Sequence, residues 1–128
     1  MSTSHAFSIL VADDEPDLLS EVVGYLRHRG QQVIAVPSFG DAVCAFAENI
    51  DSIALVLTDV RMPDGSGVEL ARLVIDQSQG KCPCLLMTGH LLDSGLDPDL
   101  KAAGVRVVDK PFSMSALYAS ILSTLARR

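Results

Sequence analysis

Five polar side chains that could act together on a phosphoryl group stand at the ends of short apolar segments. They are Asp13, Asp14, Asp59, Thr88 and Lys110. Three carboxylates that are brought together repel one another, and this repulsion raises at least one pKa unless a cation neutralises it. Mg²⁺ suits such a set, because it takes oxygen ligands and binds through one or two carboxylates together with phosphate oxygens. The residue types therefore favour a magnesium-dependent site.

The chemistry that this set favours is the attachment of a phosphoryl group to one carboxylate. Phosphoryl transfer requires mainly positioning and neutralisation of charge, and an Asp carboxylate can be the nucleophile. Asp59 is expected to carry the phosphoryl group, with Mg²⁺ and the Lys110 ammonium balancing its charge on two sides. The Thr88 hydroxyl would donate a hydrogen bond to one of its oxygens.

Each of these residues also has an ordinary structural explanation when it is taken alone. An Asp after a strand is commonly a turn or cap residue, a Thr is a frequent strand residue, and a Lys is commonly a solvated surface charge. What favours a site is the joint placement of all five residues at one edge of a sheet, and that placement depends on the elements between them.

Short apolar segments alternate with amphipathic helical patterns along the whole chain. This alternation predicts an α/β fold, with one doubly wound parallel sheet and helices on both of its faces. In such a fold the reactive side chains lie at the carboxyl ends of the strands, at the topological switch point. The first and third strands are the most apolar and are expected near the centre. The strands are predicted at 7–12, 32–36, 53–58, 84–88 and 105–109, and the helices at about 16–30, 38–49, 66–77, 97–104 and 114–125.

Length and composition fit one globular domain, predicted over residues 1–128. The chain has 128 residues and is 48 % hydrophobic, which suffices for a sizeable core. Its apolar runs are too short to span a membrane, and the first residues lack the features of a secretory signal, so a cytoplasmic location is expected. The net charge of −6 argues against direct binding of nucleic acid.

The three cysteines, Cys44, Cys82 and Cys84, predict neither a disulfide framework nor a metal site. Their number is odd and no secretory signal precedes them. A structural zinc ion usually has four ligands, and no second Cys or His pair stands at suitable spacing from Cys82 and Cys84. These two are expected to be small buried residues at the entrance of a strand.

The chain resembles the receiver domain of two-component response regulators over nearly its whole length. The resemblance rests on the pair Asp13-Asp14, "TDVRMPDGSG" around Asp59, Thr88 in "LLMTGH", and "KPF" at 110–112. It implies a flavodoxin-like sheet with strand order 2-1-3-4-5. It also implies that Asp59 accepts phosphate from a phosphohistidine of a sensor histidine kinase or a phosphotransfer protein.

The same resemblance implies a ligand set for Mg²⁺. Asp14, Asp59 and the backbone carbonyl of Arg61 would bind the ion directly, and Asp13 would act mainly through water. Lys110 would pair with the phosphoryl group, and the Lys110-Pro111 peptide is expected in the cis form that family members often have.

Two further positions of the family tune the lifetime of the phosphate, and here they are Arg61 and His90. Both side chains are large and able to carry positive charge, so they are expected to obstruct an attacking water. The alternative is that His90 acts as a base, since its unperturbed pKa is about 6.5. In the loop after the acceptor, Gly65 and Gly67 are expected to supply positive φ angles, and Gly89 is expected to leave room for the phosphoryl group.

One position departs from the family. Where a Tyr or Phe usually stands three residues before the Lys, this chain has Val107. In typical members the ring swings inward when the Thr moves towards the phosphate, whereas a valine has little rotamer freedom. One possibility is that signal output is altered on the face formed by the fourth strand, the helix after it and the fifth strand. The other is that Val107 only packs against its neighbours and that the loop after Thr88 carries the signal.

Two other functions remain open at the level of sequence. A pseudo-receiver would bind its partner without phosphorylation, and Val107 is the feature in its favour. A phosphatase would use Asp59 as a turnover nucleophile, but it usually has a second acid and a substrate-binding cap. The expected output is a downstream protein partner or an effector domain outside this chain, and a phosphorylation-dependent homodimer is a further expectation.

Overall fold

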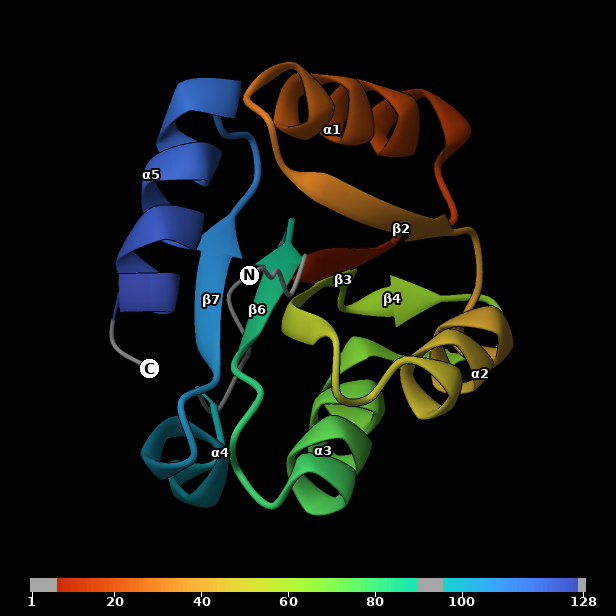
Figure 1. Ribbon diagram of the computed structural model, residues 1–128, viewed down its shortest axis with the longest axis vertical. Helices are drawn as coiled ribbons and strands as arrows, with labels where there is room; N and C mark the ends of the chain where they lie inside the picture. The colour runs from red at the N-terminus through yellow and green to blue at the C-terminus, as the bar shows by residue number, and fades with distance from the viewer. Residues whose placement is uncertain (1–6, 90–95, 127–128) are drawn as a thin grey trace, which may run out of the picture.

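The central sheet places the ends of its strands at one edge. The computed structural model describes residues 7–89 and 96–126. Its five-stranded sheet is parallel in the order β2-β1-β3-β6-β7 (Figure 1). The strands are β1 (Ser8–Ala12), β2 (Gln32–Val36), β3 (Ile53–Asp59), β6 (Cys84–Thr88) and β7 (Arg106–Asp109). The predicted strand order is confirmed, with β3 at the centre and β1 beside it.

Helices cover both faces of this sheet, as predicted. They are α1 (Pro16–His28), α2 (Phe39–Glu48), α3 (Gly67–Ser78), α4 (Pro98–Ala102) and α5 (Met114–Ala126). Alternate residues of β1 point to opposite faces: Val11 packs in a cluster with α1 and α5, and Leu10 packs in a cluster with α2, α3 and α4. Two apolar layers therefore hold the sheet between α1 and α5 on one face and α2, α3 and α4 on the other. Figure 1 shows the helices in this arrangement.

Local sequence signals explain where several helices begin. Ser38, Ser66 and Asp97 each accept a hydrogen bond from a backbone N–H in the first turn of the helix that follows. Pro16 is the first residue of α1, and Gly30 just after that helix has a φ of +85°. Asp97 also binds Arg72 of α3 with 2.6 Å between Nη2 and Oδ2, so this residue joins α3 to the start of α4.

Two details differ from the sequence prediction. The loop after Asp59 contains a small antiparallel pair, β4 (Arg61–Met62) and β5 (Gly65–Ser66), which sequence patterns did not predict. We call residues 61–66 the acceptor hairpin, because they follow Asp59, the residue predicted to accept the phosphoryl group. The helix expected at 97–104 is shorter, since α4 ends at Ala102.

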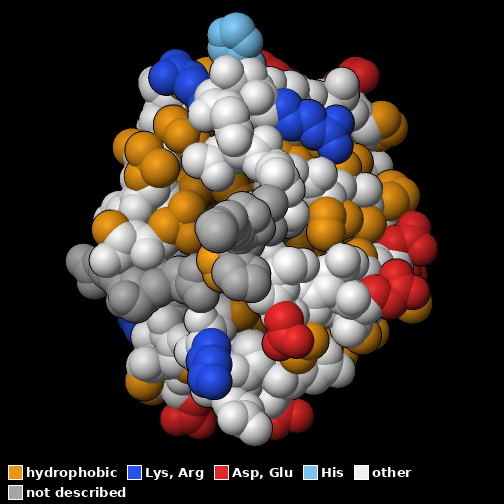
Figure 2. Space-filling view, viewed as in Figure 1, with side chains coloured by type: hydrophobic (Ala, Val, Ile, Leu, Met, Phe, Trp, Pro, Cys, Tyr) orange, Lys and Arg blue, Asp and Glu red, His pale blue; other side chains and the backbone are white. Residues whose placement is uncertain are grey.

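On the face shown in Figure 2, Lys and Arg side chains lie in separate small groups among acidic and uncharged ones. Among the described residues, no helix has the length and apolar character that crossing a membrane requires. Cys82 and Cys84 are buried at the start of β6, as predicted.

Candidate functional site

Three carboxylates converge at the carboxyl ends of β1 and β3. One oxygen each from Asp13, Asp14 and Asp59 lies within 4.8 Å of the other two. The three differ in exposure: Asp13 is fully buried, Asp59 is partly buried and Asp14 is exposed. Neighbouring strands β1 and β3 end in register here, with Ala12 opposite Thr58. The pairing of these two strands therefore gathers acids that are more than forty residues apart in the sequence.

Asp13 has an unfavourable environment for a carboxylate. Its Oδ1 accepts a hydrogen bond from the Glu15 N–H at 2.9 Å, but its buried Oδ2 has no partner among the described residues. Burial raises the pKa of Asp13, and the negative charges of Asp59 and Asp14 raise it further, against the opposing effects of the Glu15 hydrogen bond and of Lys110. A buried charged oxygen without a partner is costly. The site is therefore built for a positive charge beside Asp13.

A hard divalent cation fits this set of groups. The donors are carboxylate oxygens, which Mg²⁺ prefers, and the buried Oδ2 of Asp13 has capacity for a further contact. Arg61 is the first residue of β4, two residues after the end of β3, and it is exposed. The residues present are thus compatible with a magnesium ion held between the ends of β1 and β3.

Lys110 brings a positive charge to the Asp59 carboxylate. Its Nζ lies 3.4 Å from Oδ1 of Asp59, and the two side chains are 22 % and 14 % exposed. The backbone N–H of Lys110 donates to the carbonyl of Thr88 at 2.6 Å, so the backbone of Lys110 is fixed at the end of β6. The Lys110-Pro111 peptide is cis, as the resemblance implied.

Thr88 lies on β6 and Val107 on β7, the two strands on the side of β3 opposite β1. Thr88 is the last residue of β6 and is 5 % exposed. A Cβ atom on Gly89 would meet no atom of the described residues within 4 Å. Val107 is 38 % exposed and borders a hollow of about 270 Å³ between β7 and α5. It therefore lies at the surface and is only partly packed.

The glycines that follow Asp59, Gly65 and Gly67, are required for space. The expectation that Gly65 and Gly67 supply positive φ angles is wrong, because the described glycines with positive φ are Gly30, Gly80 and Gly104. A Cβ atom on Gly67 would collide with the carbonyl oxygen of Asp59 and lie 3.0 Å from the Val60 Cα. A Cβ atom on Gly65 would overlap the ring of Phe39. Close backbone approach therefore explains both residues.

This crowding gives a testable expectation for Gly67→Ala. The added methyl group meets backbone atoms, which cannot rotate away, so the variant should lose about 1–3 kcal/mol of unfolding free energy. Gly24→Ala is the matched control, because Gly24 is exposed within α1 and a Cβ there meets nothing within 4 Å. That control should gain about 0.5–1 kcal/mol. Urea unfolding measures both, and equal stability of the two variants would contradict the crowding.

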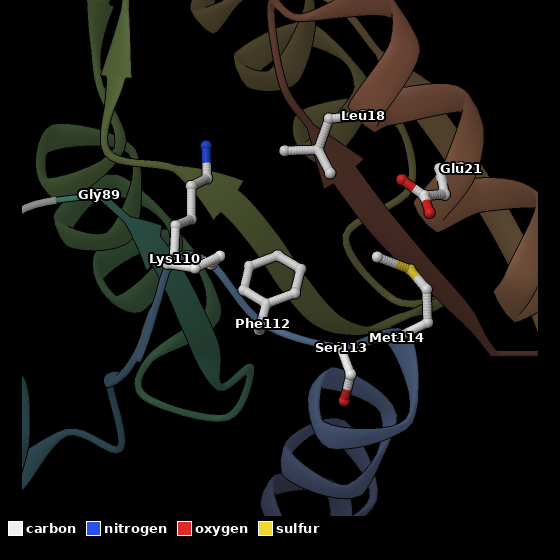
Figure 3. A pocket seen from close by; sticks show the side chains of 8 residues that line it. Leu18, Glu21, Gly89, Lys110, Phe112, Ser113 and Met114 are labelled. Atoms are coloured by element: carbon white, nitrogen blue, oxygen red, sulfur yellow. The ribbon is translucent and has the colours of Figure 1, made fainter.

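An apolar pocket lies beside Lys110. It has a volume of about 570 Å³ and lies between the first half of α1 and the segment that joins β7 to α5. Figure 3 shows Leu18 and the Phe112 ring facing each other across it, with Met114 near Glu21. Leu18 and Met114 fall within the helices predicted at 16–30 and 114–125, but their part in this pocket was not predicted. No local spacing could have revealed it.

The structure brings together Asp13, Asp14, Asp59 and Lys110, and it places Thr88 at the neighbouring strand end. His90, which was predicted to tune the lifetime of the phosphate, lies outside the described residues. Arg61 lies in the acceptor hairpin, two residues after Asp59.

Comparison with known proteins agrees with this architecture. The family model described as "Response regulator receiver domain" matches residues 9–122. The transcriptional regulatory protein FixJ of Rhizobium meliloti is 32 % identical over 115 residues, which cover 90 % of this chain and 55 % of FixJ. The probable transcriptional regulatory protein TcrX of Mycobacterium tuberculosis is 29 % identical over 94 % of this chain and 50 % of TcrX. The chain thus spans about half the length of these curated relatives.

A solved structure shares the whole fold. The response regulator receiver domain protein of Clostridium thermocellum superposes with a TM-score of 0.84 at 29 % identity, covering 94 % of this chain and 95 % of that one. The family match, the relatives and the fold lead to one conclusion: this chain belongs to the response regulator receiver domain family.

Proposed function

We propose that the chain accepts a phosphoryl group on Asp59 from a phosphohistidine of a sensor histidine kinase or a phosphotransfer protein. In this step an Asp59 oxygen attacks phosphorus, the N–P bond of the phosphohistidine breaks, and the neutral imidazole leaves. The observation that carries the proposal is the Asp59 carboxylate, which lies in a cluster of three acids and 3.4 Å from the Lys110 ammonium. Charge neutralisation of this kind is what phosphoryl transfer requires.

Each neighbouring side chain has a defined part in the proposal. Asp14, Asp59 and the Arg61 carbonyl would hold Mg²⁺, with Asp13 acting through water. The ion would supply positive charge to the phosphoryl oxygens. Lys110 pairs with the phosphoryl group from the opposite side, since its ammonium already lies beside Asp59. The Thr88 hydroxyl donates a hydrogen bond to the phosphoryl group.

The apolar pocket beside Lys110 supports docking of the phosphate donor at α1. Leu18 and Phe112 offer apolar surface next to the acceptor site (Figure 3). A helix of the donor that covers this surface would bury apolar area and would bring its phosphohistidine to Asp59. The exposed Glu21 at the pocket rim favours a donor with a positive charge at that position.

Output is proposed to run through the surface that β6, α4 and β7 form. Thr88 ends β6, and Val107 of the neighbouring strand β7 is exposed. Because Val107 has no ring to move, we propose that movement of the segment after Thr88 carries the signal. Beryllofluoride, a mimic of the phosphoryl group, can be used to test this output. A similar solved structure supports its use: the DrrB receiver domain, described as "BeF3 Activated", is 25 % identical and superposes with a TM-score of 0.74 over 94 % of this chain.

The recipient of the signal is proposed to be a protein. It is a separate partner, an effector domain of a longer protein, or a second copy of this chain after phosphorylation. The relatives named above are transcriptional regulators about twice as long as this chain, which supports the effector domain. Direct binding of nucleic acid by this domain is not proposed, because its net charge is −6.

Incubation with acetyl phosphate and Mg²⁺ tests the proposed function. A receiver should take up one labile phosphate per chain, whereas a pseudo-receiver takes up none. A phosphatase should instead release many equivalents of inorganic phosphate. Intact-mass measurement together with a free-phosphate assay separates these outcomes.

The lifetime of the phosphate is expected to be long, because Arg61 and His90 would flank the approach of water. Positive charge near the phosphate stabilises ground state and transition state alike, and such uniform stabilisation gives no acceleration. Arg61→Ala and His90→Ala should each shorten the lifetime. The decay rate should be measured from pH 6 to 8, a range around the ordinary histidine pKa of about 6.5. If His90→Ala slows decay, and wild-type decay rises as His90 loses its proton, His90 is a base and obstruction is wrong.

A further inference from the structure

Asp64 in the acceptor hairpin binds a helix that is distant in sequence. Its Oδ1 accepts the Phe39 N–H and its Oδ2 accepts the Gly40 N–H, both at 2.9 Å. These donors are the first two amides of α2, where the helix dipole also favours a negative charge. The two hydrogen bonds lower the pKa of Asp64, so the carboxylate is ionised at neutral pH.

The contact is more than the cap of α2, because that helix already has a cap of its own. Ser38 is its N-cap residue and accepts the Asp41 N–H at 3.1 Å. Asp64 reaches the same helix end from 24 and 25 residues away, and it comes from the turn between β4 and β5. Its particular effect is therefore to tie the acceptor hairpin to α2, which lies beside β4 in Figure 1.

The acceptor hairpin is in turn joined closely to Asp59. Within it, Arg61 pairs with Ser66 and Met62 pairs with Gly65. Gly65 lies against the Phe39 ring, and so a second contact holds the hairpin on α2. At its end the Gly67 N–H donates to the Val60 carbonyl at 2.8 Å, while Gly67 touches the Asp59 carbonyl.

We infer that Asp64 is a positioning residue of the phosphorylation site: by fastening the acceptor hairpin to α2, it fixes the backbone of Arg61 beside Asp59. The inference rests on the proposed function, in which the Arg61 carbonyl is a ligand of Mg²⁺. Asp64 itself touches neither the metal nor the phosphate. Groups behind a ligand of this kind commonly change metal affinity by about tenfold or more when they are removed.

The test compares Asp64→Ala with Ser38→Ala. Both remove a hydrogen-bond acceptor from the start of α2, but only Asp64→Ala releases the acceptor hairpin. Calorimetric titration with Mg²⁺ alone should show a Kd about tenfold higher for Asp64→Ala and an unchanged Kd for Ser38→Ala. Hydrogen exchange of the Gly67 amide should accelerate about tenfold in Asp64→Ala only, because local opening of the hairpin exposes it.

A conservative variant distinguishes loss of the Asp64 contact from misfolding of the protein. Asp64→Asn keeps one acceptor oxygen for α2, so its Mg²⁺ affinity should lie between those of wild type and Asp64→Ala. Equal Mg²⁺ affinities and equal Gly67 exchange in Asp64→Ala and Ser38→Ala would overturn the inference, as would wild-type affinity in both Asp64 variants. A wild-type protein that binds Mg²⁺ but takes no phosphate from acetyl phosphate would refute the proposed function. It would leave the inference about Asp64 standing, because the Asp64 comparison does not use phosphate.

Discussion

Replacing Asp59 with Asn is expected to abolish stable phosphate uptake from acetyl phosphate while the protein stays folded. An amide oxygen is a far weaker nucleophile than a carboxylate, so no acyl phosphate forms at this position. Asp59 is also the acid of the cluster that lies beside Lys110. Loss of phosphorylation should therefore be complete within the sensitivity of intact-mass measurement.

The stability of Asp59→Asn separates loss of chemistry from loss of structure. The change removes one of three crowded negative charges, which relieves repulsion of Asp13. It also removes the ion pair with Lys110, whose side chains are mostly buried, and the loss of this attraction offsets part of that relief. Urea unfolding without Mg²⁺ should show little net change or a gain.

Asp51→Asn is the matched control for this variant. Asp51 is an exposed acid just before β3, at the opposite end of the strand that carries Asp59. This control should take up phosphate as the wild type does. Phosphate uptake by Asp59→Asn at the wild-type level would refute the assignment of the acceptor.

The second large effect is expected for Asp13→Asn, which should stabilise the protein when Mg²⁺ is absent. Burial raises the pKa of Asp13 above its ordinary value of 3.8. Between 3.8 and the raised pKa, the folded protein holds a proton that the unfolded chain has released. Stability therefore falls as the pH rises through this window, and it remains lower at neutral pH.

The Asn side chain removes this cost, since it places no charge in the buried position. At about pH 7 the gain should be on the order of 1–3 kcal/mol, because an unpaired buried charge costs more than the neutral amide that replaces it. The gain should shrink as the pH is lowered towards 3.8, where the wild-type carboxyl becomes protonated as well. Urea unfolding in EDTA across this range measures it.

Saturating Mg²⁺ should reverse the order of stability of the wild type and Asp13→Asn. A bound cation compensates the charge of Asp13, so saturating Mg²⁺ should stabilise the wild type more than Asp13→Asn. Asp51→Asn again provides the control, with no dependence on Mg²⁺ beyond that of the wild type. A less stable Asp13→Asn in EDTA at neutral pH would contradict the electrostatic account of this buried acid.

The strand ends could be predicted because they depend on local patterns. Apolar segments followed by Asp13, Asp59 and Thr88 mark buried parallel strands, and parallel strands end at one edge whatever their order. The helix starts at Ser38 and Asp97 follow from capping chemistry that acts within one turn. These features require only residues that are close in sequence.

The rest depends on contacts between distant segments. The need for glycine at position 65 comes from the Phe39 ring, which local sequence does not place there. The hydrogen bonds of Asp64 join residues 24 and 25 positions apart with no periodic signal. Packing of the whole sheet buries Asp13, which raises its pKa, and leaves the neighbouring Asp14 exposed. Local sequence does not distinguish these two acids.

Chemical mapping of the phosphorylated residue tests the central claim most directly. The wild-type protein is incubated with acetyl phosphate and Mg²⁺ and then treated with borohydride, which reduces an aspartyl phosphate to homoserine. Peptide sequencing by mass spectrometry then locates the reduced residue. The account predicts homoserine at position 59 and an unmodified carboxylate at Asp13 and Asp14. Homoserine at any other acid, or none in a folded protein supplied with Mg²⁺, would contradict it.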